Sequence, residues 1–216
     1  MNTLFIDIET IQSFKVADIN NFTAPANYKD AEKIEAYKLE AQKEELQKTP
    51  LKSLRGHILC IGFAENDEDV KCVFGNTEYL NADNIEFYER TLLERFANKI
   101  KSSYDKIAGH YIKQFDIPFI LHRAYKYRNY DLINLLKSDK WGKGFDCTHE
   151  MFAGTDTKNH YSLKDIANFF GIENHKNELD GSHVQRLFEA NELHTIEEYC
   201  KADVELERII YNLLKN

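Results

Sequence analysis

Short apolar runs mark the first strands of the chain. Residues 3–8 alternate apolar and acidic side chains toward their end, and residues 57–64 and 70–75 are two further apolar runs. Runs of this length and content are typical of β-strands. Between the first two runs, residues 30–48 are rich in Glu, Lys, Ala and Leu and contain no Gly or Pro. This composition predicts a helix inserted between two strands, either solvated at the surface or laid over a site.

The second half of the chain is dominated by helical spacing. Apolar positions three and four residues apart predict a helix over residues 84–100, and residues 106–110 predict a short buried strand. Another helix is expected from Phe115 onward, and residues 144–147 predict one more short strand. The remaining predicted helices span residues 162–170, 182–190 and 195–214.

Capping signals refine the ends of these last helices. Ser162 and Thr195 are suitable N-caps, the latter with Glu198 three residues on as a capping box, and Gly171 is a suitable C-terminal stop. The order of elements, with strands first, then alternation, then helices, predicts an α/β fold. We expect a mixed sheet flanked by helices on both faces.

The composition is typical of a globular protein with one domain. The chain has 216 residues, of which 43% are hydrophobic and 12% aromatic, enough for a sizeable core in a single domain over residues 1–216. No apolar run approaches the roughly 18 residues of a membrane span, and residues 1–10 lack the features of a signal peptide, so we expect a cytoplasmic protein. The cysteines are scattered without CxxC spacing and are interpreted as small hydrophobic residues: Cys60, Cys72, Cys147 and Cys200.

The charge is uneven along the chain. The formal net charge of -8 argues against a protein that coats nucleic acid electrostatically. Residues 99–145, however, carry ten Lys or Arg against four Asp. Aromatic residues such as Tyr111 and Trp141 interleave with these cations, a mixture that suits a strand of stacked bases or, equally, a solvated helix face over buried rings.

The most informative stretch is FIDIET at residues 5–10. Side chains alternate across a strand, so Asp7 and Glu9 share one face about 7 Å apart, whereas Ile6 and Ile8 point to the other side. Two buried carboxylates repel one another unless a cation or donors satisfy both. The stretch by itself fits a metal site and a water-facing edge strand equally well.

Two further stretches carry isolated acids. Asp116 stands where a strand and turn give way to a helix, and by itself it would be explained as a helix cap. Tyr199 and Asp203 lie four residues apart on the last helix, so they share one helical face. Each of these signals is weak when taken alone.

Together these stretches resemble the three motifs of the DEDD superfamily of 3′-to-5′ exonucleases, in the branch with tyrosine in its third motif. FIDIET matches the first motif, HYIKQFDIPFI the second and YCKADVE the third, in the order of the family. The stretch around residues 161–167 and the later segment from Gly171 to residues 179–181 also look like stand-alone bacterial proteins related to the proofreading domain of B-family DNA polymerases. The resemblance covers residues 4–209 and implies a ribonuclease-H-like fold.

The resemblance implies a two-metal-ion hydrolysis of phosphodiester bonds with Mg²⁺ or Mn²⁺. Asp7 would bridge both ions, Glu9 and Asp203 would complete the first, and Asp116 would hold the second. Tyr199 would orient the attacking water, since an unperturbed pKa of about 10 makes a phenol a poor base at neutral pH. The products would be nucleoside 5′-monophosphates released from the 3′ end of single-stranded DNA.

Several residues are candidates for contact with the nucleic acid strand. Tyr111 replaces an Asn that relatives usually carry five residues before the second-motif Asp, and it could stack on a base or simply pack. Other acids are interpreted as structural: Asp146 and Asp180 as turn or capping groups, and Glu205 and Glu207 as solvent-facing. The remaining strand-contact candidates are His110, Lys113, Phe115, Lys164 and Lys176.

Alternatives remain open. The chain could be an RNA-specific 3′-to-5′ exoribonuclease, because no residue visibly reads a 2′-hydroxyl. It could be a catalytically inactive nucleic-acid-binding module, although all four acids and the tyrosine are present. An endonuclease or a ribonuclease H on this fold would lack the terminal pair of Tyr199 and Asp203. Since 216 residues leave no room for a polymerase, we expect the protein to act alone or with a separate replication or repair protein.

Overall fold

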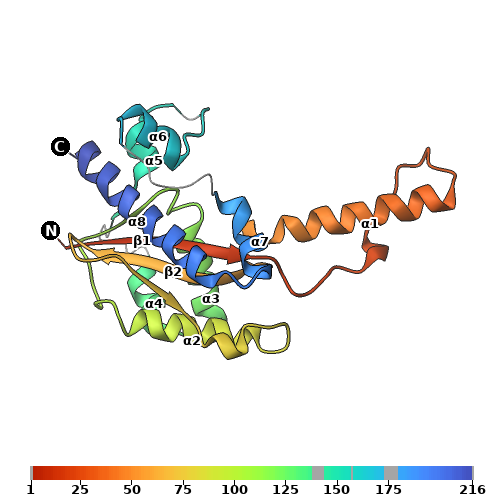
Figure 1. The fold of residues 1–216 in the computed structure, drawn as a ribbon, viewed down its shortest axis with the longest axis horizontal. Coiled ribbons are helices and arrows are strands. Elements are labelled where there is room, and N and C mark those ends of the chain that lie inside the picture. The colour runs from red at the N-terminus through yellow and green to blue at the C-terminus, as the bar shows by residue number, and fades with distance from the viewer. Residues whose placement is uncertain (1, 138–143, 157, 173–179, 216) are drawn as a thin grey trace.

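A five-stranded mixed sheet forms the centre of the computed structural model, in the order β3-β2-β1-β4-β5 (Figure 1). The structure describes residues 2–137, 144–156, 158–172 and 180–215. The central strand β1 pairs antiparallel with β2 and parallel with β4, so it joins an antiparallel half of the sheet to a parallel half. The strands are β1 (Thr3–Ile11), β2 (His57–Glu65), β3 (Lys71–Phe74), β4 (Lys106–Gly109) and β5 (Gly144–Cys147).

Helices cover both faces of the sheet, which confirms the predicted fold class (Figure 1). The long helix α8 (Leu193–Lys215) crosses β1 and β2 together with α7 (Val184–Glu189). On the other face lie α2 (Ile85–Ala97), α3 (Asp116–Tyr127) and α4 (Tyr130–Leu136). Two short helices, α5 (Thr148–Ala153) and α6 (Leu163–Phe169), pack against α8.

The alternation in β1 divides its side chains between two cores. Ile6 and Ile8 belong to the large cluster that includes Leu92, Phe96 and Ile120 from the helices α2 and α3. Phe5 belongs instead to a small cluster with α8, and its ring meets that of Tyr211 edge-on at 5.3 Å. The face of β1 that points to α8 is therefore the face that also carries Asp7 and Glu9.

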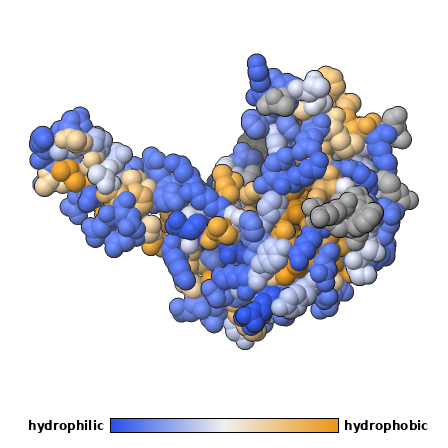
Figure 2. All heavy atoms as spheres, turned by 180° about the vertical axis from the view of Figure 1, so that it is seen from behind, coloured by the Kyte–Doolittle hydropathy of each residue, from blue (hydrophilic) through white to orange (hydrophobic). Residues whose placement is uncertain are grey.

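The inserted helix α1 (Ala31–Gln47) forms an arm that stands clear of the sheet (Figures 1 and 2). None of its residues is buried, and its surface is mostly hydrophilic with apolar patches. Asp30 caps its start by accepting a hydrogen bond from the Glu32 N–H. Its root is fixed to the end of β1, where Thr10 Oγ1 donates to the Pro50 carbonyl at 3.0 Å.

The helix ends agree with the predicted caps at one helix and differ from them at another. Ser162 caps α6 in a capping box with Asp165, and Gly171 follows this helix with a φ of +66°, as expected. The N-cap prediction for Thr195 is wrong, because α8 begins two residues earlier and Thr195 Oγ1 contacts the Glu192 carboxylate instead. Short elements that the pattern did not predict are α5 and the 3-10 turns Ile19–Asn21, Thr49–Leu51, Thr77–Tyr79 and Gly181–His183.

Within the residues described, none of the helices combines the length and apolar character needed to cross a membrane.

Candidate active site

The first two acids lie on β1 just before a shift in the register of its pairing with β2. Glu9 is buried and Asp7 is half-buried, and both point to the α8 face of the sheet. Across the antiparallel pair, Asp7 lies opposite Gly62 and Glu9 lies opposite Cys60, and the register shifts directly after Glu9. The two carboxylates thus lie on the central strand beside a register shift, an irregularity of the kind that is common next to active sites.

Asp116 joins these acids from a distant part of the chain. Its Oδ1 accepts a hydrogen bond from the backbone N–H of Ile8 at 3.1 Å, so its carboxylate lies between Asp7 and Glu9 along β1. The helix-cap explanation is wrong, because Phe115 occupies the N-cap of α3 without a capping bond and Asp116 is the first helical residue. The side chain that looked like a local cap therefore makes a long-range contact.

Burial gives Asp116 an unusual ionisation. Its residue is only 2% exposed, and this burial raises the pKa of Asp116 well above its usual range, with the Asp7 carboxylate raising it further. Hydrogen bonds from backbone N–H groups lower the pKa only partly. A carboxyl group in this setting is either protonated or stabilised by a cation.

Tyr199 and Asp203 reach the same place from α8. They lie one helical turn apart, and Asp203 is 7% exposed. Gly62 permits the close approach of this helix, since a Cβ at that position would lie 2.9 Å from Val204 Cγ2. Burial raises the pKa of Tyr199, and the charges of Glu9 and Asp7 raise it further, so the phenol keeps its proton and acts as a hydrogen-bond donor.

A cavity of about 850 Å³ opens over these side chains. Asp7, Glu9, Tyr199 and Asp203 line it, and Phe115 does so beside Asp116. Two cations that pattern analysis did not single out, Lys43 of α1 and Arg186 of α7, also line the cavity. The other lining residues are Ile8, Thr10, Gln12, Leu46, Gln47, Pro50, Leu51, Gly181, Ser182, Gln185 and Glu189.

The root of the arm supplies one wall of this cavity. Leu46, Gln47 and Pro50 belong to α1 and the turn after it, and they face α7 across the opening. The backbone N–H of Gln12 donates to Gln185 Oε1 at 2.8 Å, which links the chain leaving β1 to α7. The sequence did not indicate Lys43 and Arg186, because each lies on an ordinary polar helix face. Only the tertiary fold brings both to the same cavity.

Phe115 is the one strand-contact candidate among the described residues that line the cavity. Tyr111 is packed within the protein: its ring stacks on His149 with centroids 4.2 Å apart, and its hydroxyl lies 3.0 Å from His160 Nδ1. Its backbone is left-handed, with a φ of +55°. A direct role of Tyr111 at the substrate stays a prediction.

The basic candidates have other surroundings. Lys113 forms an ion pair with Glu150 at 2.6 Å, and His110 Nδ1 lies 3.3 Å from Thr148 Oγ1. Lys164 is exposed near the start of α6. Their contacts with a nucleic acid strand stay predictions. Trp141 and Lys176 lie outside the described residues.

Two of the acids interpreted as structural behave differently from expectation. Glu207 is buried, with 1% exposure, and its Oε1 accepts from the His110 backbone N–H at 2.8 Å, so the solvent-facing prediction is wrong. Asp146 is a strand residue that pairs with Lys106 at 2.9 Å and accepts from the Tyr211 hydroxyl. Glu207 follows Asp203 by one helical turn, so it shares the inward face of α8.

The other two acids fit their interpretation more closely. Asp180 caps the turn Gly181–His183 by accepting from the Ser182 N–H, as expected of a capping group. The Glu205 side chain is 44% exposed and pairs with Arg208.

The donor set suits a hard divalent cation. Ligand atoms of Asp7, Glu9 and Cys200 all lie within 4.8 Å of one another, and Asp116 and Asp203 adjoin them. Carboxylate oxygens are the ligands that Mg²⁺ and Mn²⁺ prefer. Burial and the nearby Asp7 carboxylate both raise the pKa of Asp116, and a bound cation would favour its ionised form. The residues therefore fit a metal ion.

Comparison with known proteins agrees with this architecture. A family model described as the RNase_H superfamily matches residues 45–215, which shows that the chain belongs to this family. The fold is an RNase H-like nuclease fold. No curated protein matches the chain.

Among solved structures, the chain is similar to the family B DNA polymerase from the hyperthermophilic archaeon Pyrobaculum calidifontis. The TM-score is 0.52 at 14% sequence identity, and the match covers 99% of this chain. It covers 24% of the polymerase chain, so this protein corresponds to about a quarter of that enzyme's length. At this identity the similarity concerns the fold alone.

Proposed function

We propose that this protein is a metal-dependent 3′-to-5′ exonuclease that acts on single-stranded DNA. The proposal is carried by one observation: Asp116 reaches β1 and bonds to the backbone between Asp7 and Glu9, beside the α8 residues Tyr199 and Asp203. Two of the distant segments bring acidic groups to one cavity, and the third places Asp116 against the strand that carries Asp7 and Glu9. The motif order and the nuclease fold of the family support the same conclusion.

The acidic residues would hold two divalent cations, Mg²⁺ or Mn²⁺. Bound cations of this kind lower the pKa of an attacking water and stabilise charge on the phosphoryl and leaving oxygens. Asp7 is central among the acids, because it adjoins both Glu9 and Asp116, which suits the bridging position. Glu9 and Asp203 would complete one site, and Asp116 would serve the other.

Tyr199 would position the attacking water. Its raised pKa keeps the phenol protonated at neutral pH, so it can donate a hydrogen bond but cannot act as the base. It lines the cavity together with Asp7, Glu9 and Asp203. The phenol is thus an orienting group.

The cavity walls would hold the end of the strand. Lys43 and Arg186 offer positive charge for phosphates, and the Phe115 ring offers an apolar surface for a base or sugar. The whole chain, 1–216, would act as one exonuclease domain, with the arm over residues 30–48 forming part of the substrate wall. A separate replication or repair protein could deliver the strand.

The decisive experiment is degradation of single strands labelled at the 3′ or the 5′ end, as DNA and as RNA, with Mg²⁺, Mn²⁺ or EDTA. We expect stepwise loss from the 3′ end of DNA, with nucleoside 5′-monophosphates as products and no cleavage in EDTA. Preference for RNA would establish an exoribonuclease. Binding without cleavage would establish an inactive nucleic-acid-binding module.

Substitution of Asp7 ties this activity to the site. Asp7→Ala is expected to lower the cleavage rate by at least about 1,000-fold, because the residue adjoins two other acids of the cluster. Glu205→Gln is a matched control, since Glu205 is an exposed acid on α8. Thermal unfolding of both variants shows whether folding is intact. An Asp7→Ala protein that is folded and fully active would refute the assignment.

A further inference from the structure

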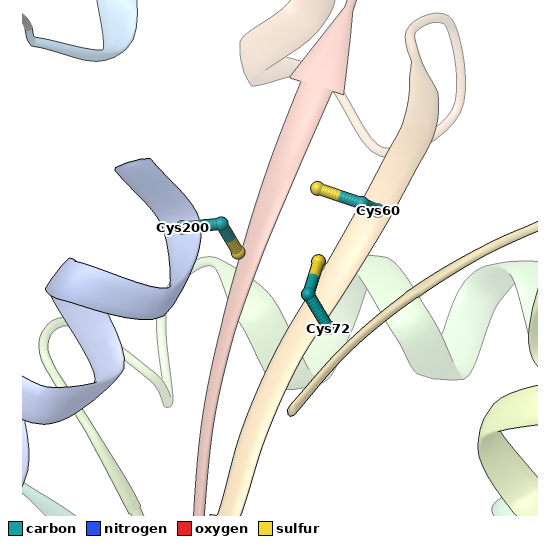
Figure 3. A group of neighbouring side chains, drawn as sticks. All are labelled: Cys60, Cys72 and Cys200. Atoms are coloured by element: carbon teal, nitrogen blue, oxygen red, sulfur yellow. The ribbon is translucent and has the colours of Figure 1, made fainter. Parts of the chain in front are cut away.

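Three cysteines from different elements meet in one group (Figure 3), and one of them, Cys200, lies beside Asp7. Cys60 belongs to β2, Cys72 to β3 and Cys200 to α8, and their Sγ atoms all lie within 4.8 Å of one another. Cys60 and Cys200 are buried, whereas Cys72 is half-buried. The group therefore lies in the protein interior and reaches toward the surface through Cys72.

The strand register explains why two of these thiols face the acids. Asp7, Gly62 and Cys72 are successive partners across β1, β2 and β3, and Glu9 and Cys60 are partners in the next row. Residues paired on neighbouring strands point to the same face of a sheet. Both thiols therefore stand on the face that carries the carboxylates.

The third thiol occupies the space left by a missing side chain. A Cβ at Gly62 would lie 2.7 Å from Cys200 Sγ, so the sulfur sits directly above this glycine. The same sulfur lies 3.7 Å from Asp7 Oδ2. Cys200 thus belongs to the thiol group and touches the acidic group at once.

The spacing of the sulfurs fits a bound cation better than a disulfide. A tetrahedral cation with metal–sulfur bonds of about 2.3 Å holds its sulfurs about 3.8 Å apart, within reach of small side-chain rotations here. Cys60 and Cys72 are diagonal neighbours, since their strand partners are Phe74 and Gly62. Diagonal Cα atoms are about 7 to 8 Å apart, beyond the usual disulfide range of roughly 4.4 to 6.8 Å.

We propose that Cys60, Cys72 and Cys200 bind a single thiophilic cation of the Zn²⁺ or Cd²⁺ class, and that its binding inhibits the neighbouring carboxylate site. Thiolate sulfurs select such cations, whereas the carboxylates next to them select Mg²⁺ or Mn²⁺. The thiols release their protons to solvent on binding.

The inhibition follows from the contact between the two groups. A cation on three sulfurs lacks a fourth ligand, and the Asp7 carboxylate is adjacent to Cys200. Asp7 would turn toward the sulfurs and be lost to the carboxylate site. This second part of the inference rests on the proposed exonuclease function, whereas the binding of the cation does not.

Binding is tested with Cd²⁺ on the reduced full-length chain, by the ultraviolet charge-transfer band of cadmium–thiolate bonds. We expect the band to saturate at one equivalent and Cys72→Ala to weaken the affinity at least about 100-fold. Cys147→Ala is the control, because Cys147 is a buried cysteine that lies apart from the group, at the end of β5. Absence of the band, or a band unchanged in Cys72→Ala, would overturn the site. Cys72→Ser replaces Cys72→Ala if thermal unfolding shows that the alanine variant does not fold.

Inhibition is tested by cleavage of single-stranded DNA in excess Mg²⁺. One equivalent of Cd²⁺ should abolish the activity of the unsubstituted chain and of Cys147→Ala, and leave that of Cys72→Ala largely intact. Equal inhibition of all three would refute the coupling, because the cation would then act elsewhere. A chain that cleaves nothing in Mg²⁺ or Mn²⁺ would refute the exonuclease proposal, while the charge-transfer titration would still decide the thiol site.

Discussion

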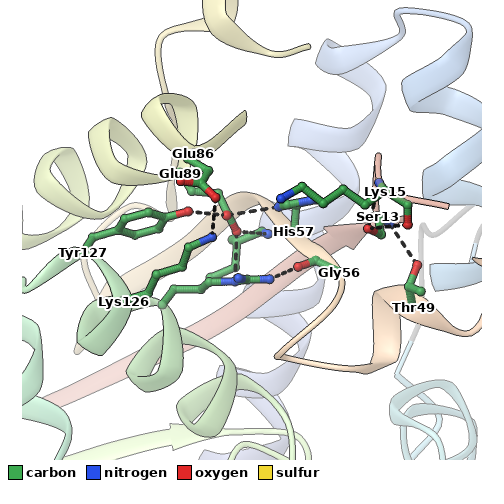
Figure 4. A network of polar contacts seen from close by, with 11 residues as sticks. Ser13, Lys15, Thr49, Gly56, His57, Glu86, Glu89, Lys126 and Tyr127 are labelled. Carbon is green, nitrogen blue, oxygen red and sulfur yellow. Dashed lines mark hydrogen bonds and ion pairs between the residues drawn. The ribbon is translucent and has the colours of Figure 1, made fainter. Parts of the chain in front are cut away.

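Two buried carboxylate sites in this protein solve the same electrostatic problem in opposite ways. Glu89 of α2 is fully buried, and the protein supplies a cation for it: Arg123 Nε lies 3.1 Å from Glu89 Oε1. His57 Nδ1 lies 3.1 Å from Glu89 Oε2 (Figure 4). The Tyr127 hydroxyl and the Ile58 N–H donate to the same carboxylate. Burial raises the pKa of Glu89, but His57 and Arg123 outweigh it, so the pKa lies below its usual range.

Asp116 is almost as deeply buried as Glu89, yet its pKa moves upward. The groups that act on it are its own burial, the negative Asp7 and backbone N–H donors. The difference separates a structural site from a candidate functional one. The charge of Glu89 is neutralised by groups of the protein itself, and this network holds α2, α3 and β2 together. Under the proposed function, the acids around Asp7 would instead receive positive charge from bound cations.

Removal of the internal cation is the largest expected effect. Arg123→Met leaves Glu89 buried with its other hydrogen-bond partners but without the guanidinium, and it should lower the free energy of unfolding by about 3–5 kcal/mol. Arg95→Met is the control. Arg95 lies on the same helix as Glu89, but it donates to the carbonyls of Phe74 and Gly75 instead. Urea unfolding measures both. Equal losses would mean that the Glu89 network adds no special stability.

Addition of the external cation should have the converse effect at the other site. Mn²⁺ at 100 times its Kd is expected to stabilise the folded chain by about 2.7 kcal/mol, because it binds the folded state alone. Asp203→Asn should lose most of this stabilisation, and Glu205→Gln should keep it. The rise in Tm with added metal is the measurement. A Tm that does not change in millimolar Mn²⁺ would contradict the proposal that these acids bind a cation.

Tyr199→Phe should have a smaller effect, confined to catalysis. It removes the donor hydroxyl and leaves the acids in place, so we expect about a tenfold lower kcat, equivalent to about 1.4 kcal/mol, with the Mn²⁺ stabilisation unchanged. A loss as large as that of Asp7→Ala would show that the phenol does more than orient water. Single-turnover cleavage at saturating strand concentration gives the rate.

The smallest expected effect concerns pH in the absence of metal. With its pKa raised, folded Asp116 binds a proton that the unfolded chain has already released, so its contribution to stability declines as pH rises above the ordinary Asp pKa. Asp116→Asn keeps an acceptor for the Ile8 N–H but does not titrate. Its stability in EDTA should therefore fall less steeply with pH. Superimposable urea-unfolding profiles of the two proteins across pH would count against this account.

The strands and the motif residues were predictable because their signals are local. Alternation in β1 placed Asp7 and Glu9 on one face, and spacing on α8 placed Tyr199 with Asp203, as the structure has them. Motif order then indicated that Asp116 joins them. Its bond to Ile8 requires the parallel pairing of β1 and β4, which no local pattern encodes.

Other features depended on how elements pack. The prediction that Glu207 faces solvent neglected its position on the helix. One turn after Asp203, it lies on the inward face of α8. The cysteine group was invisible because Cys60 and Cys72 are brought together by strand register and Cys200 by helix packing. Helix α5 escaped because six residues are too few for a periodic pattern.

The absence of a side chain at Gly62 sets how deeply α8 descends onto the sheet. One added methyl group would lift the helix, and with it the phenol of Tyr199, the carboxylate of Asp203 and the sulfur of Cys200 would rise as a unit. The two proposed metal sites would then widen together, even with all of their own ligands intact. Val204→Ala would relieve only part of this crowding, because the added carbon would also meet Cys200 Sγ at 2.7 Å.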